Sequence, residues 1–321
     1  MNTDKKPTVI FFGTPEFAVE SLRQIYKAGY EIKAVVTAPD KPAGRGMQIQ
    51  LSDVKKAALE LDLPVLQPEK LKNPEFLADL AAYDADIFVI IAFRMLPREV
   101  WGMPRLGTFN LHASLLPDYR GAAPINWAVI NGDSETGVTT FFLQHQIDTG
   151  DILFQEKIKI GEDENVGSVY DRLMKLGADL TVKTLGSISA GTITPVPQSD
   201  IEAKAQRLAP KILKETSRID WNKNSAVIHN LVRGMSPYPG AWTEMTAGGS
   251  PVKLIKIYKT SKTDIMPENP DPGKLTVENG KLFVDTADKK LEILEIQQQG
   301  KKKMSVSEYL LGAKLDNVRF V

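Results

Sequence analysis

Apolar runs and amphipathic segments alternate along the first two-thirds of the chain. The apolar runs, which favour strands, span residues 8–13, 32–37, 86–92 and 107–114. The segments with helical spacing of apolar residues span 52–62, 73–83, 123–132 and 166–191. Residues 137–144 and 151–160 alternate with a period of two and predict a hairpin. Alternating strands and helices predict an α/β fold with a mostly parallel sheet covered by helices on both faces.

The pattern changes after residue 191. Residues 192–215 combine several prolines with charged residues, which favours a connecting segment. A short helix is expected near 222–234, and brief alternating segments follow it, separated by Gly, Pro, Asn and Asp. Such segments predict a small barrel or sandwich. Because the chain of 321 residues is longer than a single core usually grows, we expect two domains.

Composition and missing motifs exclude several kinds of chemistry. The chain has no Cys and only three His, so it can form no disulfide and no thiolate metal site, and it has no Cys nucleophile. The glycine fingerprint of a dinucleotide site, the P-loop, the HExxH zinc motif and the GxSxG elbow are all absent from the sequence. We therefore expect an enzyme, if it is one, that works without a metal.

The N-terminal stretch MNTDKKPTVIFFG contains only a short apolar run. It lacks the longer apolar region of a secretion signal, and no apolar stretch approaches the roughly 18–20 residues that span a bilayer. Together with the lack of Cys, this favours a cytoplasmic protein with no membrane partner.

The net charge of zero conceals an asymmetry along the chain. Residues 1–208 contain 22 basic and 27 acidic residues, whereas residues 209–321 contain 18 basic and 13 acidic ones. A basic C-terminal part suits a polyanionic partner such as a nucleic acid. An ordinary lysine-rich surface would show the same charge, so charge alone leaves both interpretations open.

One expected strand carries two polar residues of catalytic type. Asn110 and His112 lie two positions apart near the C-terminal end of the strand at 107–114, so their side chains project to the same face. Ligands of open α/β sheets bind beyond these carboxyl ends. Asp148 follows in a turn within the expected hairpin. The three residues offer an amide donor, an imidazole and an orienting carboxylate. A hydrogen-bonded structural His and a turn-forming Asp would give the same spacing.

A polar, glycine-rich stretch at 38–53 carries Lys41 and Arg45. It is too polar for a core, so we expect a mobile loop. Such a loop is either a solvated connection or an arm that grips phosphates and becomes ordered on binding.

Several motifs of the sequence belong to a known enzyme family. They are GTPEFA (13–18), PDKPAGRG (39–46), HASLLPDYRGAAPINWAVINGD (112–133), TGVTTF (136–141), DTGDIL (148–153), RIDW (218–221) and GKKKM (300–304). On these residues the chain resembles the methionyl-tRNA formyltransferase family, one of the folate-dependent formyltransferases, along nearly its full length. The HxSLLP run and the later DTGD are specific to the wider family. The PAGRG loop and the linked C-terminal domain indicate the members that act on tRNA.

The resemblance implies a fold, an activity and partners. The fold is a Rossmann-like formyltransferase domain with a mostly parallel sheet at 1–191, a linker at 192–208 and an OB-like tRNA-binding β-barrel at 209–321. The activity is transfer of a formyl group from 10-formyltetrahydrofolate to the free amino group of methionyl initiator tRNA, with no metal. We expect a cytoplasmic monomer whose partners are the folate co-substrate and the initiator methionyl-tRNA.

The resemblance also assigns residues by matching positions. The catalytic group looks like Asn110, His112 and Asp148. The wall of the folate pocket looks like Ser114, Leu115, Leu116 and Pro117. The candidates for tRNA binding are Lys41, Arg45, Lys301, Lys302 and Lys303, of which Arg45 matches the arginine of the family's tRNA-gripping loop. The stretch AFRMLP (92–97) departs from the family pattern by one missing residue and by Arg94, close to the expected pterin contacts.

Two other functions share parts of this pattern. A related folate enzyme could formylate an amino-sugar nucleotide or a purine-pathway ribonucleotide, but the basic loop at 38–50 and the basic C-terminal part argue against it. An RNA-binding protein whose first domain is catalytically dead is a further alternative. The intact set of Asn110, His112 and Asp148 argues against that alternative.

Overall fold

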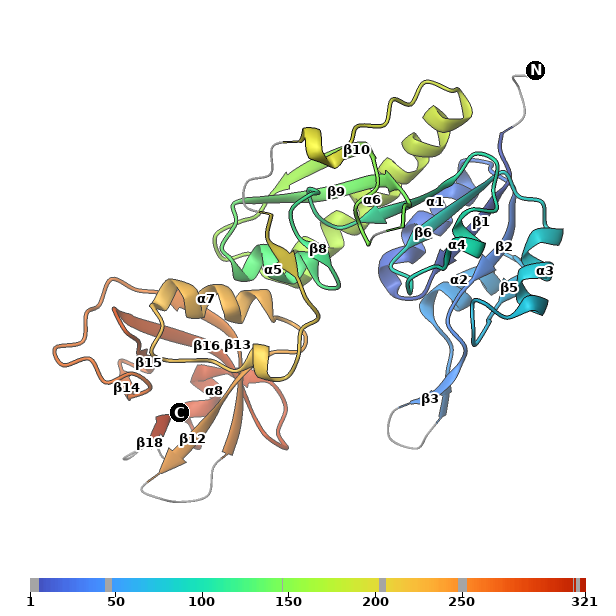
Figure 1. Ribbon diagram of the computed structural model, residues 1–321. Helices are drawn as coiled ribbons and strands as arrows, with labels where there is room; N and C mark the ends of the chain where they lie inside the picture. The colour runs from blue at the N-terminus through green and yellow to red at the C-terminus, as the bar shows by residue number, and fades with distance from the viewer. Residues whose placement is uncertain are drawn as a thin grey trace. The chain divides into compact units, whose positions relative to one another are not determined.

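The computed structural model describes residues 6–43, 48–145, 147–201, 206–247, 253–313, 315 and 318–321 (Figure 1). The chain forms two compact units. The first unit contains residues 1–121, 137–158 and 170–208, and the second contains residues 122–136, 159–169 and 209–321. Two segments that precede residue 191 therefore belong to the second unit.

A seven-stranded sheet forms the centre of the first unit. Its strands, in spatial order, are β10 (Ile152–Lys159), β9 (Glu135–Phe142), β7 (Thr108–His112), β6 (Ile87–Ile91), β1 (Val9–Gly13), β2 (Ile32–Val36) and β5 (Val65–Leu66). The five strands from β7 to β5 pair in parallel, and β9 runs antiparallel to β7. The prediction of a mostly parallel sheet is confirmed. The strand order reverses at β1, which lies between β2 and β6, so the adjacent carboxyl ends form the place where such sheets bind ligands.

Apolar side chains cover both faces of this sheet. On one face, Phe12 and Phe88 pack in one cluster with Leu80 of α3 (Pro74–Ala82). The helix α6 (Val166–Ser189) packs closely against β7. A Cβ on Gly177 of this helix would lie 2.7 Å from Cδ2 of Leu111 on the strand. Burial on both faces explains why the sequences of β1 and β6 are apolar throughout instead of alternating.

The other helices of the first unit are short. They are α1 (Val19–Lys27), α2 (Asp53–Glu60) and α4 (Arg98–Trp101). Ser52 caps α2, because its side chain accepts the backbone N–H of Lys55 at 3.1 Å. In the part of the chain that the structure describes, no helix is both long and apolar enough to cross a membrane.

Residues 38–53, for which the sequence predicts a mobile loop, contain two short strands among the described residues. The strands β3 (Lys41–Ala43) and β4 (Gln48–Gln50) pair antiparallel. Asp40, at the base of this hairpin, forms an ion pair with Lys55 of α2 and accepts a hydrogen bond from Gln67 at 2.8 Å. These two hydrogen bonds lower the pKa of the Asp40 carboxyl. The sequence shows no strand pattern here because neither face of the hairpin is buried: Lys41, Pro42, Ile49 and Gln50 are all exposed.

The sheet of the second unit is antiparallel and nearly closes into a barrel, as Figure 1 shows in orange and red. Its strands, in spatial order, are β14 (Leu275–Glu278), β15 (Lys281–Asp285), β16 (Lys290–Gln298), β13 (Lys253–Lys262), β12 (Ala241–Ala247) and β18 (Val318–Phe320). The short β17 (Met304–Ser305) pairs with β16. The two ends of the sheet meet where the N–H of Phe320 donates to the carbonyl oxygen of Gly273 at 2.8 Å. The prediction of an OB-like β-barrel is confirmed.

Three helices accompany this barrel: α5 (Pro124–Ile130), α7 (Ser225–Gly234) and α8 (Val306–Leu310). Ile228 and Val232 of α7 join the barrel core, in which Trp221 stacks on Phe320 with ring centroids 5.5 Å apart. The side-chain amide of Asn126 on α5 donates to the carbonyl oxygen of Gly234 at 2.8 Å. This contact helps to place α5 in the second unit, although it lies far from α7 in the sequence. Two further short pieces, β8 (Arg120–Gly121) and β11 (Leu208–Ala209), pair with each other.

A buried histidine of α7 contacts the loop at 161–164. His229 is only 2% exposed, and its Nδ1 lies 2.9 Å from the hydroxyl of Thr260. Its Nε2 lies 3.2 Å from a carboxylate oxygen of Asp163. Burial lowers the pKa of His229, and the hydrogen bond with the carbonyl oxygen of Glu162 and the attraction of Asp163 offset that effect only in part.

We expect the free energy of unfolding to fall as the pH drops below about 6.5, the ordinary histidine pKa. Between that value and the lowered pKa of folded His229, the unfolded chain binds more protons than the folded one, so acid favours unfolding. The test is the melting temperature between pH 5 and 7.5 for wild type and His229→Gln, with the exposed His145→Gln as control. The melting temperature should fall less between pH 7.5 and pH 5 in His229→Gln than in wild type. An identical pH dependence in all three proteins would show that His229 does not contribute.

Candidate active site

Strand β7 carries two of the residues that the sequence analysis selected. Asn110 and His112 project from the same side of this strand, two positions apart. Their neighbours on the other side, Phe109 and Leu111, are buried as expected. His112 is 7% exposed and Asn110 is half-buried. The side-chain amide of Asn110 forms no hydrogen bond with any residue that the structure describes, so it is available to a ligand.

The turn after β7 determines which nitrogen of His112 carries a proton. Nε2 of His112 lies 2.9 Å from the backbone carbonyl oxygen of Tyr119. A carbonyl oxygen can only accept a hydrogen bond, so Nε2 is protonated and donates. In the neutral ring, Nδ1 therefore presents a lone pair.

Asp148 lies on the Nδ1 side of this ring. Its Oδ2 is 3.9 Å from Nδ1 of His112, which is too far for a hydrogen bond but close enough to attract an imidazolium. The same oxygen accepts the backbone N–H of Gly121 at 3.2 Å. The side chains of His112 and Asp148 are only 8% and 14% exposed, so water screens their interaction weakly. The structure thus brings these two residues together and places Asn110 on the adjoining part of β7.

A glutamine distant in sequence holds the turn that carries Asp148. The side-chain amide of Gln198 donates to the carbonyl oxygens of Asp148 at 2.9 Å and Gly150 at 2.8 Å. Its own oxygen accepts two hydrogen bonds from the guanidinium of Arg120. Gln198 could not be found from the sequence, because no motif surrounds it and it lies within the expected linker at 192–208.

The expected folate wall forms a turn with many internal hydrogen bonds. Ser114 is fully buried, and its hydroxyl donates to the carbonyl oxygen of Asp118 at 2.7 Å. The Thr139 hydroxyl donates to the carbonyl oxygen of Ser114 at 2.6 Å. Leu116 and Pro117 are buried, whereas Leu115 is partly exposed. The Ser114 hydroxyl is thus engaged within the turn, and the assignment of residues 114–117 to the folate pocket stays a prediction.

Arg94, the departure noted in AFRMLP, binds backbone oxygens. Its Nη1 donates to the carbonyl oxygen of Glu69 at 2.8 Å, and its Nη2 donates to that of Pro68. The guanidinium lies 5.6 Å from the ring centroid of Phe93. Partial burial lowers the pKa of Arg94. The side chain is therefore held by the segment at 68–69.

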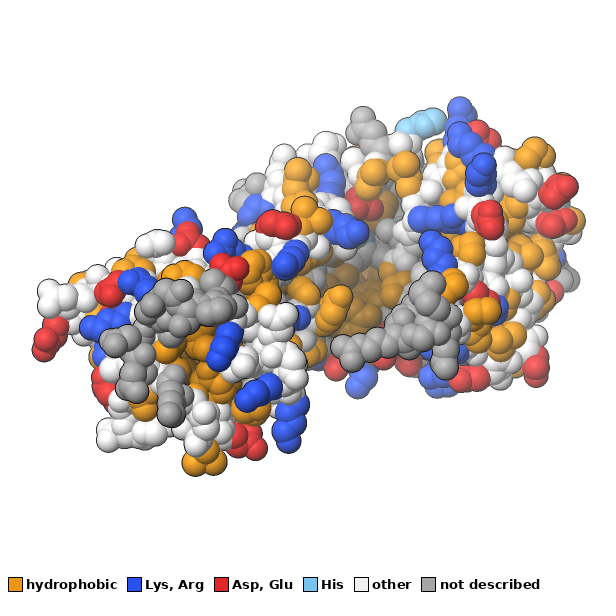
Figure 2. Space-filling view, turned by 90° about the horizontal axis from the view of Figure 1, so that it is seen from below, with side chains coloured by type: hydrophobic (Ala, Val, Ile, Leu, Met, Phe, Trp, Pro, Cys, Tyr) orange, Lys and Arg blue, Asp and Glu red, His pale blue; other side chains and the backbone are white. Residues whose placement is uncertain are grey.

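The candidate tRNA-binding residues are exposed where the structure describes them. Lys41 lies on β3, and Lys301 and Lys302 follow β16; all three are exposed. Lys303 is also exposed and forms an ion pair with Glu295 at 2.8 Å. Arg45 lies outside the described residues. Figure 2 shows Lys and Arg side chains spread over one face of the molecule among apolar and acidic ones.

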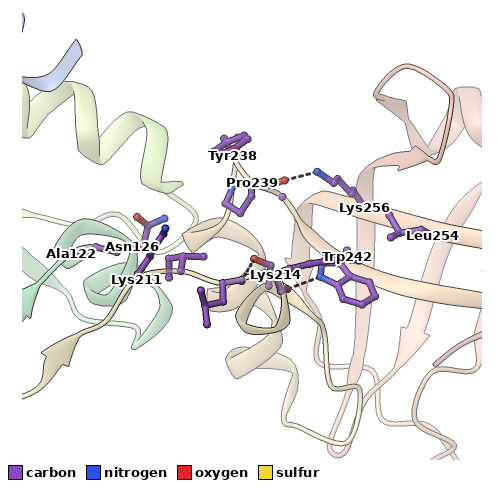
Figure 3. A pocket seen from close by; sticks show the side chains of 14 residues that line it. Ala122, Asn126, Lys211, Lys214, Tyr238, Pro239, Trp242, Leu254 and Lys256 are labelled. Atoms are coloured by element: carbon purple, nitrogen blue, oxygen red, sulfur yellow. Dashed lines mark hydrogen bonds between the residues drawn. The ribbon is translucent and has the colours of Figure 1, made fainter. Parts of the chain in front are cut away.

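A cavity of ≈ 560 Å³ in the second unit gathers further basic residues (Figure 3). Its lining contains Lys211, Lys214 and Lys256 and no acidic residue. Lys256 donates to the carbonyl oxygen of Pro239 at 2.7 Å, and the ammonium of Lys214 lies 5.2 Å from the ring centroid of Trp242. None of the three lysines forms an ion pair with an acidic residue among those described. Their positive charge is therefore not neutralised locally, which suits an anionic ligand.

Metal ligands do not gather in the part of the chain that the structure describes. No group of three or more His, Asp or Glu side chains there is placed to hold a metal ion.

Two formyltransferase family models and curated methionyl-tRNA formyltransferases match this chain. The family described as "Formyl transferase" matches residues 5–185, and "Formyl transferase, C-terminal domain" matches residues 211–314. The methionyl-tRNA formyltransferase of Bacteroides thetaiotaomicron is 49% identical over 312 residues, which cover 96% of each chain. The methionyl-tRNA formyltransferase of Porphyromonas gingivalis is 45% identical over 315 residues, which cover 98% of each chain.

Two solved structures show the same fold at low sequence identity. HypX from Aquifex aeolicus, in complex with tetrahydrofolic acid, has a TM-score of 0.62 at 19% identity. The match covers 97% of this chain and 48% of HypX, so this chain spans about half of that protein. The N-formyltransferase from Helicobacter canadensis, in complex with folinic acid and dTDP-3-aminofucose, has a TM-score of 0.62 at 20% identity and covers 89% of this chain and 98% of that one.

Proposed function

This chain belongs to the methionyl-tRNA formyltransferase family, and from that premise we propose how its residues perform the reaction. It transfers the formyl group of 10-formyltetrahydrofolate to the free amino group of methionyl initiator tRNA, giving N-formylmethionyl-tRNA for translation initiation. The observation that carries this conclusion is the 49% identity to a methionyl-tRNA formyltransferase over 96% of both chains.

Asn110 is the proposed donor to the formyl oxygen. When the methionyl amine attacks the formyl carbon, negative charge develops on this oxygen, and a fixed hydrogen-bond donor lowers the energy of the transition state. The Asn110 amide suits this role because no described residue competes for it and because it lies near the carboxyl end of β7.

His112 is the proposed base. Its Nε2 proton is donated to the carbonyl oxygen of Tyr119, so the lone pair on Nδ1 can take a proton from the attacking amine. The carboxylate of Asp148, 3.9 Å away, then stabilises the positive ring. The imidazolium can return its proton to the folate nitrogen from which the formyl group departs. One ring thus moves the proton between the two nitrogens.

Residues 114–117 are the proposed wall of the folate pocket. The bonds of Ser114 with Asp118 and Thr139 fix the backbone of this turn. Leu115, the one partly exposed member, leaves apolar surface for the ligand. A flat ligand can pack against the apolar surface of such a turn while its edge forms hydrogen bonds with the fixed backbone.

Comparison of acceptors tests the function. Wild-type protein and 10-formyltetrahydrofolate would be incubated with methionyl initiator tRNA, with an amino-sugar nucleotide, or with no acceptor. We expect N-formylmethionyl-tRNA in the first reaction and no formylated acceptor in the other two. Formylation of the sugar nucleotide at a comparable rate, or unmodified tRNA, would contradict the proposal.

We propose that residues 1–191 form the catalytic domain, 192–208 the linker and 209–321 the tRNA-binding domain of a cytoplasmic monomer. The matched ranges 5–185 and 211–314 support the division. The proposed phosphate contacts are Lys41 on β3, the lysines Lys301, Lys302 and Lys303 after β16, and Arg45, which lies outside the described residues. The lysines of the cavity supplement them, since their charge is unpaired among the described residues.

Replacing Arg45 with Ala should weaken the binding of methionyl-tRNA by roughly tenfold, the usual effect of losing a hydrogen bond to a charged group. The affinity for the folate should not change, because the loop is separate in sequence from residues 114–117. Measured dissociation constants for both substrates check this, with Arg23→Ala, an arginine at the surface of α1, as control. Equal tRNA affinity in Arg45→Ala and wild type would remove Arg45 from the account.

A further inference from the structure

We propose that Gln198 and Arg120 are positioning residues that hold Asp148 beside His112 during formyl transfer. The inference rests on the role proposed above for Asp148. The two residues are called the Gln198–Arg120 clamp below. Neither belongs to the residues that the sequence motifs select for catalysis.

The turn that carries Asp148 needs external support. Asp148 has a φ of +54°, in the left-handed region that residues with a Cβ rarely adopt and that persists only where the surroundings fix it. The turn is also pressed against the end of β9, because a Cβ on Gly150 would lie 1.6 Å from the carbonyl oxygen of Phe142. The position of the Asp148 carboxylate is therefore set by what binds the turn.

Gln198 supplies that support with both of its amide hydrogens. The side chain is 6% exposed and donates to the carbonyl oxygens at both ends of the turn, those of Asp148 and Gly150. Burial removes competing water, so loss of either bond would leave a carbonyl oxygen unsatisfied.

Arg120 fixes the orientation of the Gln198 amide. The Gln198 oxygen accepts from Nε of Arg120 at 3.1 Å and from Nη2 at 2.5 Å. A flipped amide would point its NH₂ at the guanidinium and its oxygen at two carbonyl oxygens, so only one orientation satisfies all partners.

Arg120 also connects the clamp to both catalytic side chains. Its preceding neighbour Tyr119 accepts the hydrogen bond of His112, and its following neighbour Gly121 donates to the carboxylate of Asp148. Tyr119, Arg120 and Gly121 are consecutive in the sequence. They contact His112, Gln198 and Asp148, respectively. This arrangement fixes the separation of 3.9 Å between His112 and Asp148.

The chemistry of the clamp requires an amide at position 198. A glutamate there could pair with Arg120 but could not donate to the two carbonyl oxygens of the turn, and its charge would repel them. Gln198→Glu therefore keeps the size of the side chain and its contact with Arg120 while removing the support of Asp148. A role of Gln198 limited to its contact with Arg120 would survive this change.

The test compares kcat and KM of the full-length wild type, Gln198→Ala, Gln198→Glu and Asp148→Asn. We expect both Gln198 variants to lower kcat by about 10- to 100-fold, since small displacements of catalytic groups have effects of this size. The KM values for tRNA and folate should change by less than about threefold, because the contacts that bind the two substrates in the ground state are retained. Gln24→Glu, which removes the amide that donates to Glu20 on α1, is the matched control and should keep the wild-type kcat. If Gln198→Ala does not fold, Gln198→Glu decides the matter.

Combining each Gln198 variant with Asp148→Asn separates positioning from an independent effect. If the clamp acts through Asp148, the double variant should be no slower than Asp148→Asn alone. Additive losses, or wild-type kcat in folded Gln198 variants while Asp148→Asn is slow, would overturn the inference. Wild-type kcat in Asp148→Asn would instead refute the proposed role of Asp148 itself, and the clamp would then have no catalytic task.

Discussion

Replacing His112 with Ala should lower kcat by about 100-fold or more, and Asn110→Ala should have an effect of similar size. His112→Ala removes the lone pair proposed to accept the amine proton, and Asn110→Ala removes the proposed donor to the formyl oxygen. Both interactions strengthen only as the transition state forms, so the KM values should change less than kcat. Steady-state kinetics with methionyl-tRNA and 10-formyltetrahydrofolate check both variants.

His145→Ala is the matched control for the loss of an imidazole. His145 is exposed, and its ring lies edge-on to that of Trp101, with centroids 5.6 Å apart. This variant should keep the wild-type kcat. Near-normal turnover in folded His112→Ala or Asn110→Ala would remove that residue from the catalytic group.

Replacing Lys211 and Lys214 together with Ala should weaken tRNA binding and make it less sensitive to salt. Each phosphate contact contributes about one unit to the slope of log K against log salt, so the slope should become shallower by about two. Between 50 and 200 mM salt, the double variant should therefore lose roughly tenfold less affinity than wild type. A salt series of tRNA dissociation constants measures this directly.

The full chain is needed for this experiment. The second unit includes residues 122–136 and 159–169, so a chain cut at residue 208 would leave α5 without its contact to Gly234. The matched control is Lys223→Ala with Lys281→Ala, two exposed lysines of the same unit that do not line the cavity. An unchanged slope in Lys211→Ala/Lys214→Ala would mean that the cavity does not contact phosphates and that the other proposed contacts, Arg45 among them, carry the recognition.

The strands of the first sheet could be predicted from the sequence because burial on two faces leaves a continuous apolar run, as in β1 and β6. The hairpin of β3 and β4 could not, because neither of its faces is buried and no alternation is required. For α5 the apolar spacing predicted a helix but not which core it packs against. That choice depends on tertiary contacts such as the bond from Asn126 to Gly234.

The candidate site was predictable to a similar degree. The period of two placed Asn110 and His112 on one face of β7, and the turn after β9 offered Asp148. The contact of His112 with Tyr119 uses a backbone carbonyl oxygen, which every residue possesses, so no side-chain pattern marks it. Gln198 is separated by 50 positions from the turn that it supports, and composition gives no sign of such a contact.

The single-turnover rate of formyl transfer in His112→Ala tests the central claim most directly. Enzyme in excess, already saturated with 10-formyltetrahydrofolate, would be mixed with methionyl-tRNA at an enzyme concentration well above the tRNA dissociation constant, so that product release does not limit the observed rate. The account predicts a chemical step slowed by about 100-fold while both substrates bind with near wild-type affinity. A single-turnover rate equal to that of wild type would contradict the assignment of His112 as the base of the reaction.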